Sequence, residues 1–506
     1  MMMSIRAVSR VQGLVSMVLA AAFIGGCSSS PPGRPDGGGA AGGSTEGNEG
    51  TAGAGGKGGN SGAAGSGGTG GATGSAGSGG GAGSGAGGSS VGGNLGAAGV
   101  GTAGTKGSAG TAGMAGAAGG AGGPATAGAG GTGAGGSAGG AGGVGGGNPD
   151  APVAISTGNS GYACALTAGG SAACWVIGSK APVAQAGLIG TLTALSSGGA
   201  STDDYEPEID QFSCGITTAG ALECWGENVE GELGNGSTGH SGVISVPGFV
   251  PGLTSGVTAL SAGGGATSSA CAVVNGGVQC WGQNGGLLGG GSAAAYLDSP
   301  VSVTGFTGAV TAVSVGAGFG CAIVSGGAVQ CWGTNTYGQL GNGVKTNSPV
   351  AVQVSGLTSG VIAISAAASS ACALTSGGGV DCWGYGADGE LGNGSTANSA
   401  VPVSVYGLTS GVTAISTAGN SACAIVGTGG ALQCWGGNND GQLGNGSTSG
   451  SSVPVAVATL SSGVNAVSVG VGNVCVILSD GTVSCWGGNA YQGVVSNVPA
   501  HIAGIP

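Results

Sequence analysis

Short apolar stretches recur along the second part of the chain, and each has the pattern of a β-strand. In one representative unit they are Val361–Ser365, Ala371–Leu374, Gly379–Trp383 and Val401–Val405. They are rich in β-branched residues, and Gly, Ser and Asn, which favour turns, separate them. The unit therefore predicts four short strands, of which the inner two form a hairpin over a Gly-rich turn.

Both faces of this predicted hairpin are apolar. Alternation places Cys372 and Leu374 on one face of their strand. Val380 and Cys382 share that face on the partner strand, and Trp383 projects from the opposite face. A sheet that is apolar on both faces must pack between two neighbours. A ring of four-stranded blades satisfies this condition; a solenoid also would, but its end repeats would need caps.

A Cys pair whose second member is followed directly by Trp marks the unit, and it occurs seven times after Asp150. Successive first Cys residues lie 50, 57, 50, 51, 51 and 52 positions apart. A period near 50 residues predicts a stacked or radial array, here an all-β domain over residues 151–506. The pairs are Cys164 and Cys174, Cys214 and Cys224, Cys271 and Cys280, Cys321 and Cys331, Cys372 and Cys382, Cys423 and Cys434, and Cys475 and Cys485.

The third strand of most units runs into one recurrent loop sequence. It reads WGTNTYGQLGNG from Trp332, WGYGADGELGNG from Trp383, WGGNNDGQLGNG from Trp435 and WGENVEGELGNG from Trp225. This sequence resembles the repeat of the regulator of chromosome condensation family, whose members form seven-bladed β-propellers. The resemblance covers residues 151–506 and implies seven blades of four strands. Repeats one, three and seven depart from the loop sequence.

Two features of the loop have a direct structural meaning. Asn-Gly in each copy suits a tight turn with positive φ. The Leu that precedes it is expected to pack the loop against its blade, at Leu233, Leu340, Leu391 and Leu443.

The cysteine pairs predict disulfides. Within each unit the two Cys lie 9 to 11 positions apart across one hairpin, which brings facing side chains within disulfide reach. Reduced structural thiols are the alternative. A metal site would need closer ligand pairs or His, and the chain has only His240 and His501, so we predict no metal here. Seven disulfides fit an exported protein in an oxidising compartment.

The chain begins with the pattern of an export signal. Arg6 and Arg10 precede an apolar run, residues 11–24, that has about the length of a signal-peptide core. The run ends in IGGC at Cys27, which resembles the lipobox of bacterial lipoproteins. This resemblance implies that residues 1–26 are removed and that Cys27 is diacylated; a plain secretory signal is the alternative. We therefore expect a bacterial cell-envelope protein, periplasmic or on the cell surface, held to the membrane by lipid alone.

Residues 27–150 are expected to be the lipidated Cys27 followed by a disordered tether. Gly occupies 55 of the 123 positions from 28 to 150, and Ala, Ser and Thr occupy most of the others. Such small side chains cannot bury enough area to offset the backbone entropy lost on ordering. A Gly-rich coil of this length spans about 60 Å, enough to hold a domain clear of a membrane surface.

The charge of the repeat region excludes several partners. From Ala151 onward the cations are Lys180 and Lys345, against 15 carboxylates, for a formal charge of −13. Nucleic-acid binding needs clustered Lys and Arg to neutralise phosphates, so we predict no nucleic-acid partner. Anionic lipid would not attract such a surface either.

One segment is not explained by the repeat. Cys214 follows Ser196 by 18 positions, whereas the corresponding distance in most copies is 7. Insertions of this kind in propellers emerge on one face, where binding usually occurs. A solvated loop, a calcium site and a contact with a basic partner all stay open for it. The additional residues include five carboxylates, Asp203, Asp204, Glu206, Glu208 and Asp210.

No motif in the chain predicts a catalytic residue, and two His leave little scope for acid–base chemistry. Apart from calcium, we predict no cofactor. The leading hypothesis is a monomeric propeller that acts as a non-catalytic module and binds a protein partner. The family's namesake activity, nucleotide exchange on a small GTPase, fits poorly because this chain is acidic and expected to be exported. The alternatives are a structural or adhesion element and an enzyme acting on extracellular polysaccharide or peptide, which a pair of buried acids in one pocket would favour.

Overall fold

The described residues all belong to one compact unit, Met114–Pro506. The computed structural model describes residues 131–132, 148–159, 161–177, 181–200, 211–265, 268–285, 288–291, 294–489 and 494–505. The predicted signal peptide, Cys27 and the tether, apart from residues 131–132 and 148–150, lie outside these residues. The five carboxylates from Asp203 to Asp210 also lie outside them, so neither the lipid anchor nor the calcium alternative is tested.

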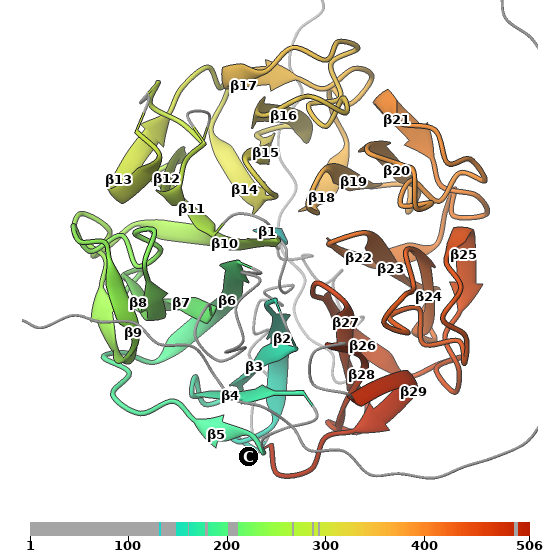
Figure 1. Cartoon of the computed structure of the whole chain (residues 1–506), viewed down its shortest axis with the longest axis horizontal. Coiled ribbons are helices and arrows are strands. Elements are labelled where there is room, and N and C mark those ends of the chain that lie inside the picture. Colours follow the sequence, from blue (N-terminus) through green and yellow to red (C-terminus); the bar gives the residue numbers. More distant parts are fainter. Residues whose placement is uncertain are drawn as a thin grey trace, which may run out of the picture. The chain divides into compact units, whose positions relative to one another are not determined.

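Seven antiparallel sheets, here called blades I to VII, surround a central axis (Figure 1). Within each blade the strands follow chain order from the axis to the rim. Their bounds are β2 Pro152–Thr157, β3 Tyr162–Thr167, β4 Ala172–Val176 and β5 Val183–Ala184 in blade I; β6 Leu192–Ala200, β7 Gln211–Thr217, β8 Leu222–Asn228 and β9 His240–Phe249 in blade II; β10 Val257–Gly265, β11 Ser269–Val274, β12 Gly277–Gln283 and β13 Tyr296–Val303 in blade III; β14 Val310–Val315, β15 Phe319–Val324, β16 Ala328–Gly333 and β17 Ser348–Gln353 in blade IV; β18 Val361–Ala366, β19 Ser370–Thr375, β20 Val380–Gly384 and β21 Ser399–Ser404 in blade V; β22 Val412–Ala418, β23 Ser421–Val426, β24 Ala431–Gly436 and β25 Ser451–Ala456 in blade VI; β26 Val464–Val469, β27 Asn473–Leu478, β28 Val483–Asn489 and β29 Val494–His501 in blade VII.

This arrangement confirms the predicted all-β propeller of seven four-stranded blades. Two short parallel pairings join neighbouring parts of the ring. Gly264 and Gly265 of β10 pair with the end of β6, and β1 (Gly131–Thr132) pairs with β18. No helix among the described residues has the length and apolar character needed to cross a membrane.

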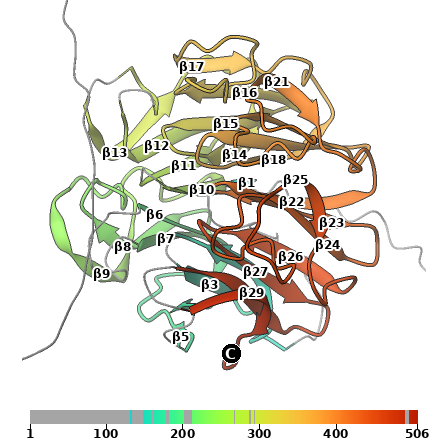
Figure 2. The ribbon, with the colours of Figure 1, turned by 45° about the vertical axis from the view of Figure 1, so that its right-hand side comes forward.

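The ring closes without exchange of strands. Blade I uses the first four strands of the ring, β2 to β5, and blade VII uses the last four, β26 to β29. The two blades lie side by side, in teal and red, in the turned view of Figure 2. Closure therefore depends on side chains that bridge the two blades.

The predicted hairpin of blade V has the expected register. Cys372 pairs with Cys382 and Leu374 with Val380 across β19 and β20. The structure contains all seven predicted disulfides, with the two Cα atoms of each pair 4.0 to 4.1 Å apart. The cysteine face of blade V packs against blade VI, including Trp435. The opposite face, with Trp383, packs against blade IV.

A belt of serines on the innermost strands ties each blade to the next. In blade V, Ser365 lies opposite Cys372 in the register, and its Oγ accepts a hydrogen bond from the backbone N–H of Thr417 in blade VI at 2.9 Å. All seven blades make this bond, and the last one closes the circle. The accepting hydroxyls belong to Ser156, Ser196, Ser261, Ser314, Ser365, Ser416 and Ser468.

Candidate functional site

In six of the seven blades, the loop after the third strand starts at a glycine that no other residue can replace without strain; blade I has Val176 there. In blade V this is Gly384, which has φ +102° and directly follows Trp383. A Cβ added to Gly384 would lie 2.5 Å from the carbonyl oxygen of Ser369. The pairing of β20 with β21 shifts register between Cys382 and Gly384. The Trp-Gly pair of the repeat therefore turns the chain out of the strand and into the loop.

Five of the seven loops are held by the tryptophan of the following blade. Trp435 of blade VI donates its indole Nε1–H to the carbonyl oxygen of Glu390 in the blade V loop at 2.8 Å. Gly392 leaves room for this indole, because a Cβ there would meet the Trp435 Nε1 at 2.7 Å. Four other loops hold the next tryptophan in the same way, through Trp281, Trp332, Trp383 and Trp486.

The two remaining tryptophans explain what the divergent repeats lose. The indole N–H groups of Trp175 and Trp225 reach no loop carbonyl oxygen among the described residues. That of Trp225 instead lies beside the Tyr162 hydroxyl of blade I. Their neighbours are blades VII and I, whose loops depart from the recurrent sequence. In repeat three, which also departs, Leu288 still supplies its carbonyl oxygen to Trp332 at 2.9 Å.

Inside the blade VI loop, an Asn and a Gln fix the backbone. In blade VI, Asn438 accepts a hydrogen bond from the N–H of Leu443 at 2.8 Å and donates to the carbonyl oxygens of Ser447 and Ser449, each at 2.9 Å. Gln442 accepts from the N–H of Asp440 at 3.0 Å. The expected packing of the loop leucines is also present, since Leu233, Leu340, Leu391 and Leu443 are all buried.

Two positions in each loop are not needed to hold it together. They directly precede the Gly of Gly-Gln/Glu-Leu: residues 336–337 in blade IV, 387–388 in blade V and 439–440 in blade VI. Their side chains differ from repeat to repeat and include Tyr337, Asp388 and Asp440. The fold thus leaves these positions available for binding.

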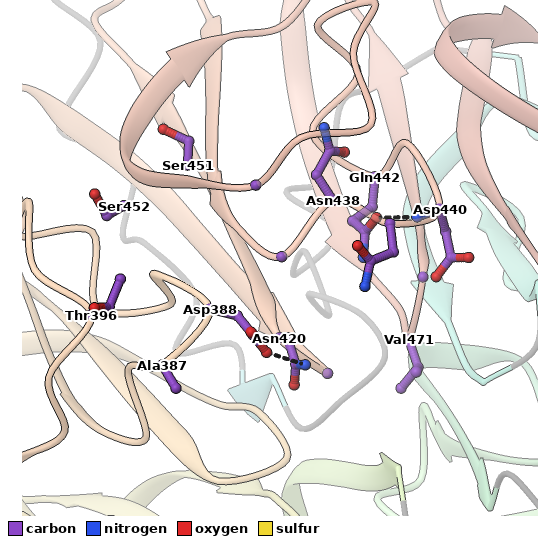
Figure 3. A pocket seen from close by; sticks show the side chains of 15 residues that line it. Ala387, Asp388, Thr396, Asn420, Asn438, Asp440, Gln442, Ser451, Ser452 and Val471 are labelled. Carbon is purple, nitrogen blue, oxygen red and sulfur yellow. Dashed lines mark hydrogen bonds between the residues drawn. The ribbon is translucent and has the colours of Figure 1, made fainter. Parts of the chain in front are cut away.

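A cleft of about 510 Å³ opens on this loop face between blades V, VI and VII (Figure 3). Asp388 comes from the blade V loop, and Asp440 and Gln442 come from the blade VI loop. The turns that connect the first two strands of blades VI and VII contribute Asn420 and Val471. Three consecutive blades contribute to it, so no single repeat forms the cleft.

The polar groups of the cleft carry an excess of acceptors. The Asp388 carboxylate accepts one hydrogen bond from Asn420 Nδ2 at 2.8 Å. The Asp440 carboxylate accepts none from the described residues, and partial burial raises its pKa. Gln442 is only 6% exposed, its Oε1 is used by the N–H of Asp440, and its Nε2 has no partner among the described residues. No lining residue carries a positive charge.

A second acidic group lies beneath Asp388. Glu390 is 3% exposed, and one of its oxygens, Oε2, accepts from the N–H of Asp388 at 2.9 Å. Burial is the main cause that raises the pKa of Glu390 to about 7, and the charge of Asp388 adds to it. Tyr385 packs edge-on against Tyr337, with ring centroids 4.9 Å apart, and burial together with the charges of Asp388 and Glu390 raises its pKa.

Sequence reasoning missed this cleft and placed its candidate binding site on the acidic insertion instead. The signal was present in the loop sequence, because the position before the Gly is acidic in three of the four complete copies, at Glu230, Asp388 and Asp440. Among the described residues, no three His, Cys, Asp or Glu side chains come together as a metal site.

Family models match the central and later blades. The regulator of chromosome condensation (RCC1) repeat matches residues 326–374, 378–425 and 430–477, and a second model of the same repeat matches residues 310–339. Human E3 ubiquitin-protein ligase HERC2 is 31% identical over 252 residues, which are 48% of this chain and 5% of HERC2. The ultraviolet-B receptor UVR8 of Arabidopsis thaliana is 31% identical over 185 residues, 36% of this chain and 42% of the receptor. The chain thus spans less than half the length of these curated relatives.

Solved structures share the fold. The crystal structure of Kap60 bound to yeast RCC1 (Prp20) superposes with a TM-score of 0.52 at 20% identity, over 64% of this chain and 78% of the other. Human WBSCR16 gives a TM-score of 0.52 at 17% identity, over 64% and 84%. These matches agree with the ring of blades described above. The chain therefore carries regulator of chromosome condensation repeats and is a seven-bladed β-propeller of that kind.

Proposed function

We propose that this chain is an exported, lipid-anchored propeller that acts as a non-catalytic protein-binding module at the bacterial cell envelope. The observation that carries the proposal is that some loop residues hold the loop in place while others are left free to contact a partner. Asn438, Gln442 and Trp486 fix the blade VI loop, whereas the carboxylate of Asp440 makes none of the hydrogen bonds that hold it. A rigid ring that presents variable side chains around a concave cleft is suited to recognising another protein.

Proteins with the same fold give this proposal a precedent. One solved structure shows yeast RCC1 (Prp20) bound to Kap60, and another is described together with the binding of Prp20p to Gsp1p and histones. Those partners are proteins, and they are partners of those propellers, not of this chain. The shared fold supports a binding role for this ring but not the same partners, because function depends on the site and not on the fold.

The proposed location at the cell envelope rests on the sequence. The apolar run of residues 11–24, the IGGC ending at Cys27 and the Gly-rich residues after it have the order of signal, lipidated residue and tether. The seven disulfides agree with an oxidising compartment.

The cleft does not meet the condition that would favour an enzyme. That condition was a pair of buried acids in one pocket. Asp388 is exposed and Asp440 is only half buried. The geometry therefore favours recognition of a partner over acid–base catalysis.

Cross-linking in cells followed by affinity capture of the full chain tests the binding role. We expect one stoichiometric protein partner. Two variants locate the contact: one in which the five carboxylates from Asp203 to Asp210 become Ser, and one carrying Asp388→Asn and Asp440→Asn. Asp381→Asn removes one negative charge from a partly exposed site outside the cleft and serves as the control. Recovery of no protein partner from any preparation would refute the module.

Replacement of Cys27 tests the anchor separately. Cys27→Ser should move the protein from the membrane fraction to the soluble fraction, and mass spectrometry of the parent should show a lipid-modified N-terminal Cys27. An unmodified Cys27 in the mature parent protein would contradict lipid anchoring and leave the ring's binding role intact.

A further inference from the structure

We propose that the cleft between blades V, VI and VII binds a lysine or arginine side chain presented by an extended segment of the partner protein. This inference rests on the proposed binding function and names the chemistry of what is bound. It is carried by the polar groups of the cleft, in which carboxylate acceptors without a cationic partner among the described residues predominate.

The first observation is the surplus of negative charge. Asp388 keeps free acceptor capacity beyond its single bond from Asn420, and the Asp440 carboxylate has no donor at all among the described residues. The one Lys or Arg among the described residues, Lys345, is not among the residues that line the cleft. A carboxylate that is partly desolvated and unpaired favours a cationic ligand, because a charge-assisted hydrogen bond restores what burial removed.

The second observation is an amide group that is buried and only half used. Gln442 lies at the base of the blade VI loop with its side chain directed into the cleft beside Asp440 (Figure 3). Its Oε1 is occupied by the N–H of Asp440, and its Nε2 has no acceptor among the described residues. Because Gln442 lines the cleft and its Nε2 has no acceptor among the described residues, this N–H is free to donate to a carbonyl oxygen from outside. A peptide supplies both requirements, a backbone carbonyl and a cationic side chain.

The remaining ligand classes fit less well. Two carboxylates repel an anion such as phosphate. The only apolar side chains that line the cleft are Ala387 and Val471, too few for an apolar ligand, and no aromatic ring lines it on which a sugar could stack. The volume of about 510 Å³ exceeds that of one long side chain and leaves room for the backbone that carries it.

Calorimetric titration of the full chain with a short peptide tests the proposal. The probe is the acetylated and amidated pentapeptide Gly-Ser-Lys-Ser-Gly; the matched peptides replace Lys by Arg or by norleucine, which keeps the alkyl chain without the charge. We expect both cationic peptides to bind and the norleucine peptide to bind at least about tenfold more weakly. The affinity should fall as salt is raised from about 50 to 200 mM, since the pair is partly exposed.

Variants then place the peptide in the cleft. Asp440→Asn removes charge at constant shape and should weaken the lysine peptide about tenfold, and Asp388→Asn should weaken it less because Asp388 is exposed. The control Asp381→Asn should leave the affinity unchanged. A photoreactive form of the peptide should label the blade V loop, residues 385–398, and the blade VI loop, residues 437–450.

Three outcomes overturn the inference. Equal binding of the norleucine and lysine peptides would show that charge is not recognised. Salt-independent binding of N-acetylglucosamine, or heat from calcium chloride alone that Asp440→Asn abolishes, would assign the cleft to a saccharide or to a metal ion. If no peptide binds while capture from cells still yields a partner that the Asp388→Asn and Asp440→Asn variant retains, the cleft proposal fails and the binding module stands.

Discussion

The backbone N–H of Thr157 donates a hydrogen bond to the Oγ of Ser468 at 2.9 Å, although 311 residues separate them. Their hydroxyl groups also lie within hydrogen-bonding distance, 2.7 Å apart. This contact is the seventh member of the serine belt and joins the first blade to the last. Because no strand is exchanged at the junction, the belt takes the place of backbone pairing between blades VII and I.

Ser468→Ala should therefore loosen the closure of the ring. The buried N–H of Thr157 would lose its acceptor, which should cost about 1 to 2 kcal/mol of unfolding free energy. Hydrogen exchange should show loss of protection in β2 and β26. The matched variant Ser365→Ala breaks the same contacts, with the N–H and the hydroxyl of Thr417, between blades V and VI and should cost a similar amount while β2 stays protected. Unchanged protection of β2 in Ser468→Ala would contradict closure through the belt.

The indole hydrogen bonds predict a difference between two equivalent tryptophans. Trp435→Phe removes the bond to the Glu390 carbonyl oxygen and leaves that oxygen unpaired, whereas Trp175→Phe removes an N–H that has no acceptor among the described residues. Both changes leave similar space, so the cavity cost should largely cancel. We expect Trp435→Phe to be more destabilising by about 1 kcal/mol, as measured by denaturant unfolding. Equal losses would show that the indole bond does not contribute to holding the loop.

Glu390 should make the stability of the ring depend on pH. Its pKa in the folded state is raised to about 7, above the value of 4.5 expected for an unperturbed Glu. A raised folded pKa means that its favourable contribution is complete below pH 4.5 and is lost as the pH rises through 7. Glu390→Gln should therefore match the parent at pH 4 and exceed it at pH 8, by about 1 kcal/mol after allowance for partial solvent screening.

The chain provides its own control for this prediction. Gln339 occupies the equivalent position in blade IV and accepts from the N–H of Tyr337 at 2.9 Å, just as Glu390 accepts from Asp388. Gln339→Glu should introduce a stability loss that grows with pH. Thermal unfolding between pH 4 and pH 8 measures both variants, and parallel curves for Glu390→Gln and the parent would refute the assignment.

The disulfides should contribute stability blade by blade. Cys372→Ala combined with Cys382→Ala opens one loop of about 11 residues, and the chain-entropy model gives roughly 2.5 to 3 kcal/mol for such a loop. Both sulfur atoms are buried in the core between blades V and VI, so thiol reagents should find them only after unfolding. Chemical denaturation with and without reductant measures the effect. Free thiols in the mature propeller region would contradict the prediction.

Features that depend on residues close in the chain could be predicted from the sequence alone. The hairpin that pairs Cys372 with Cys382 follows from alternation and a short turn, and the same rule gives the disulfides. The repeat of Cys-Trp gave the number of blades, because each copy encodes one sheet that is apolar on both faces. Even the belt had a signal, since Ala, an aliphatic residue and Ser follow one another in all seven first strands, as in Ala363, Ile364 and Ser365.

How the blades pack against one another could be seen only in the three-dimensional structure. The bond of Ser468 to Thr157, the indole of Trp435 beneath the loop of Glu390, and the cleft that joins Asp388 to Asp440 all link different repeats. Strand periodicity describes one sheet and contains no information about the rotation between neighbouring sheets. Closure without strand exchange likewise depends on contacts between the first and the last blade, which are far apart in the sequence. The candidate site could not be predicted for the same reason, because its acceptors face one another only when blades V, VI and VII are packed side by side.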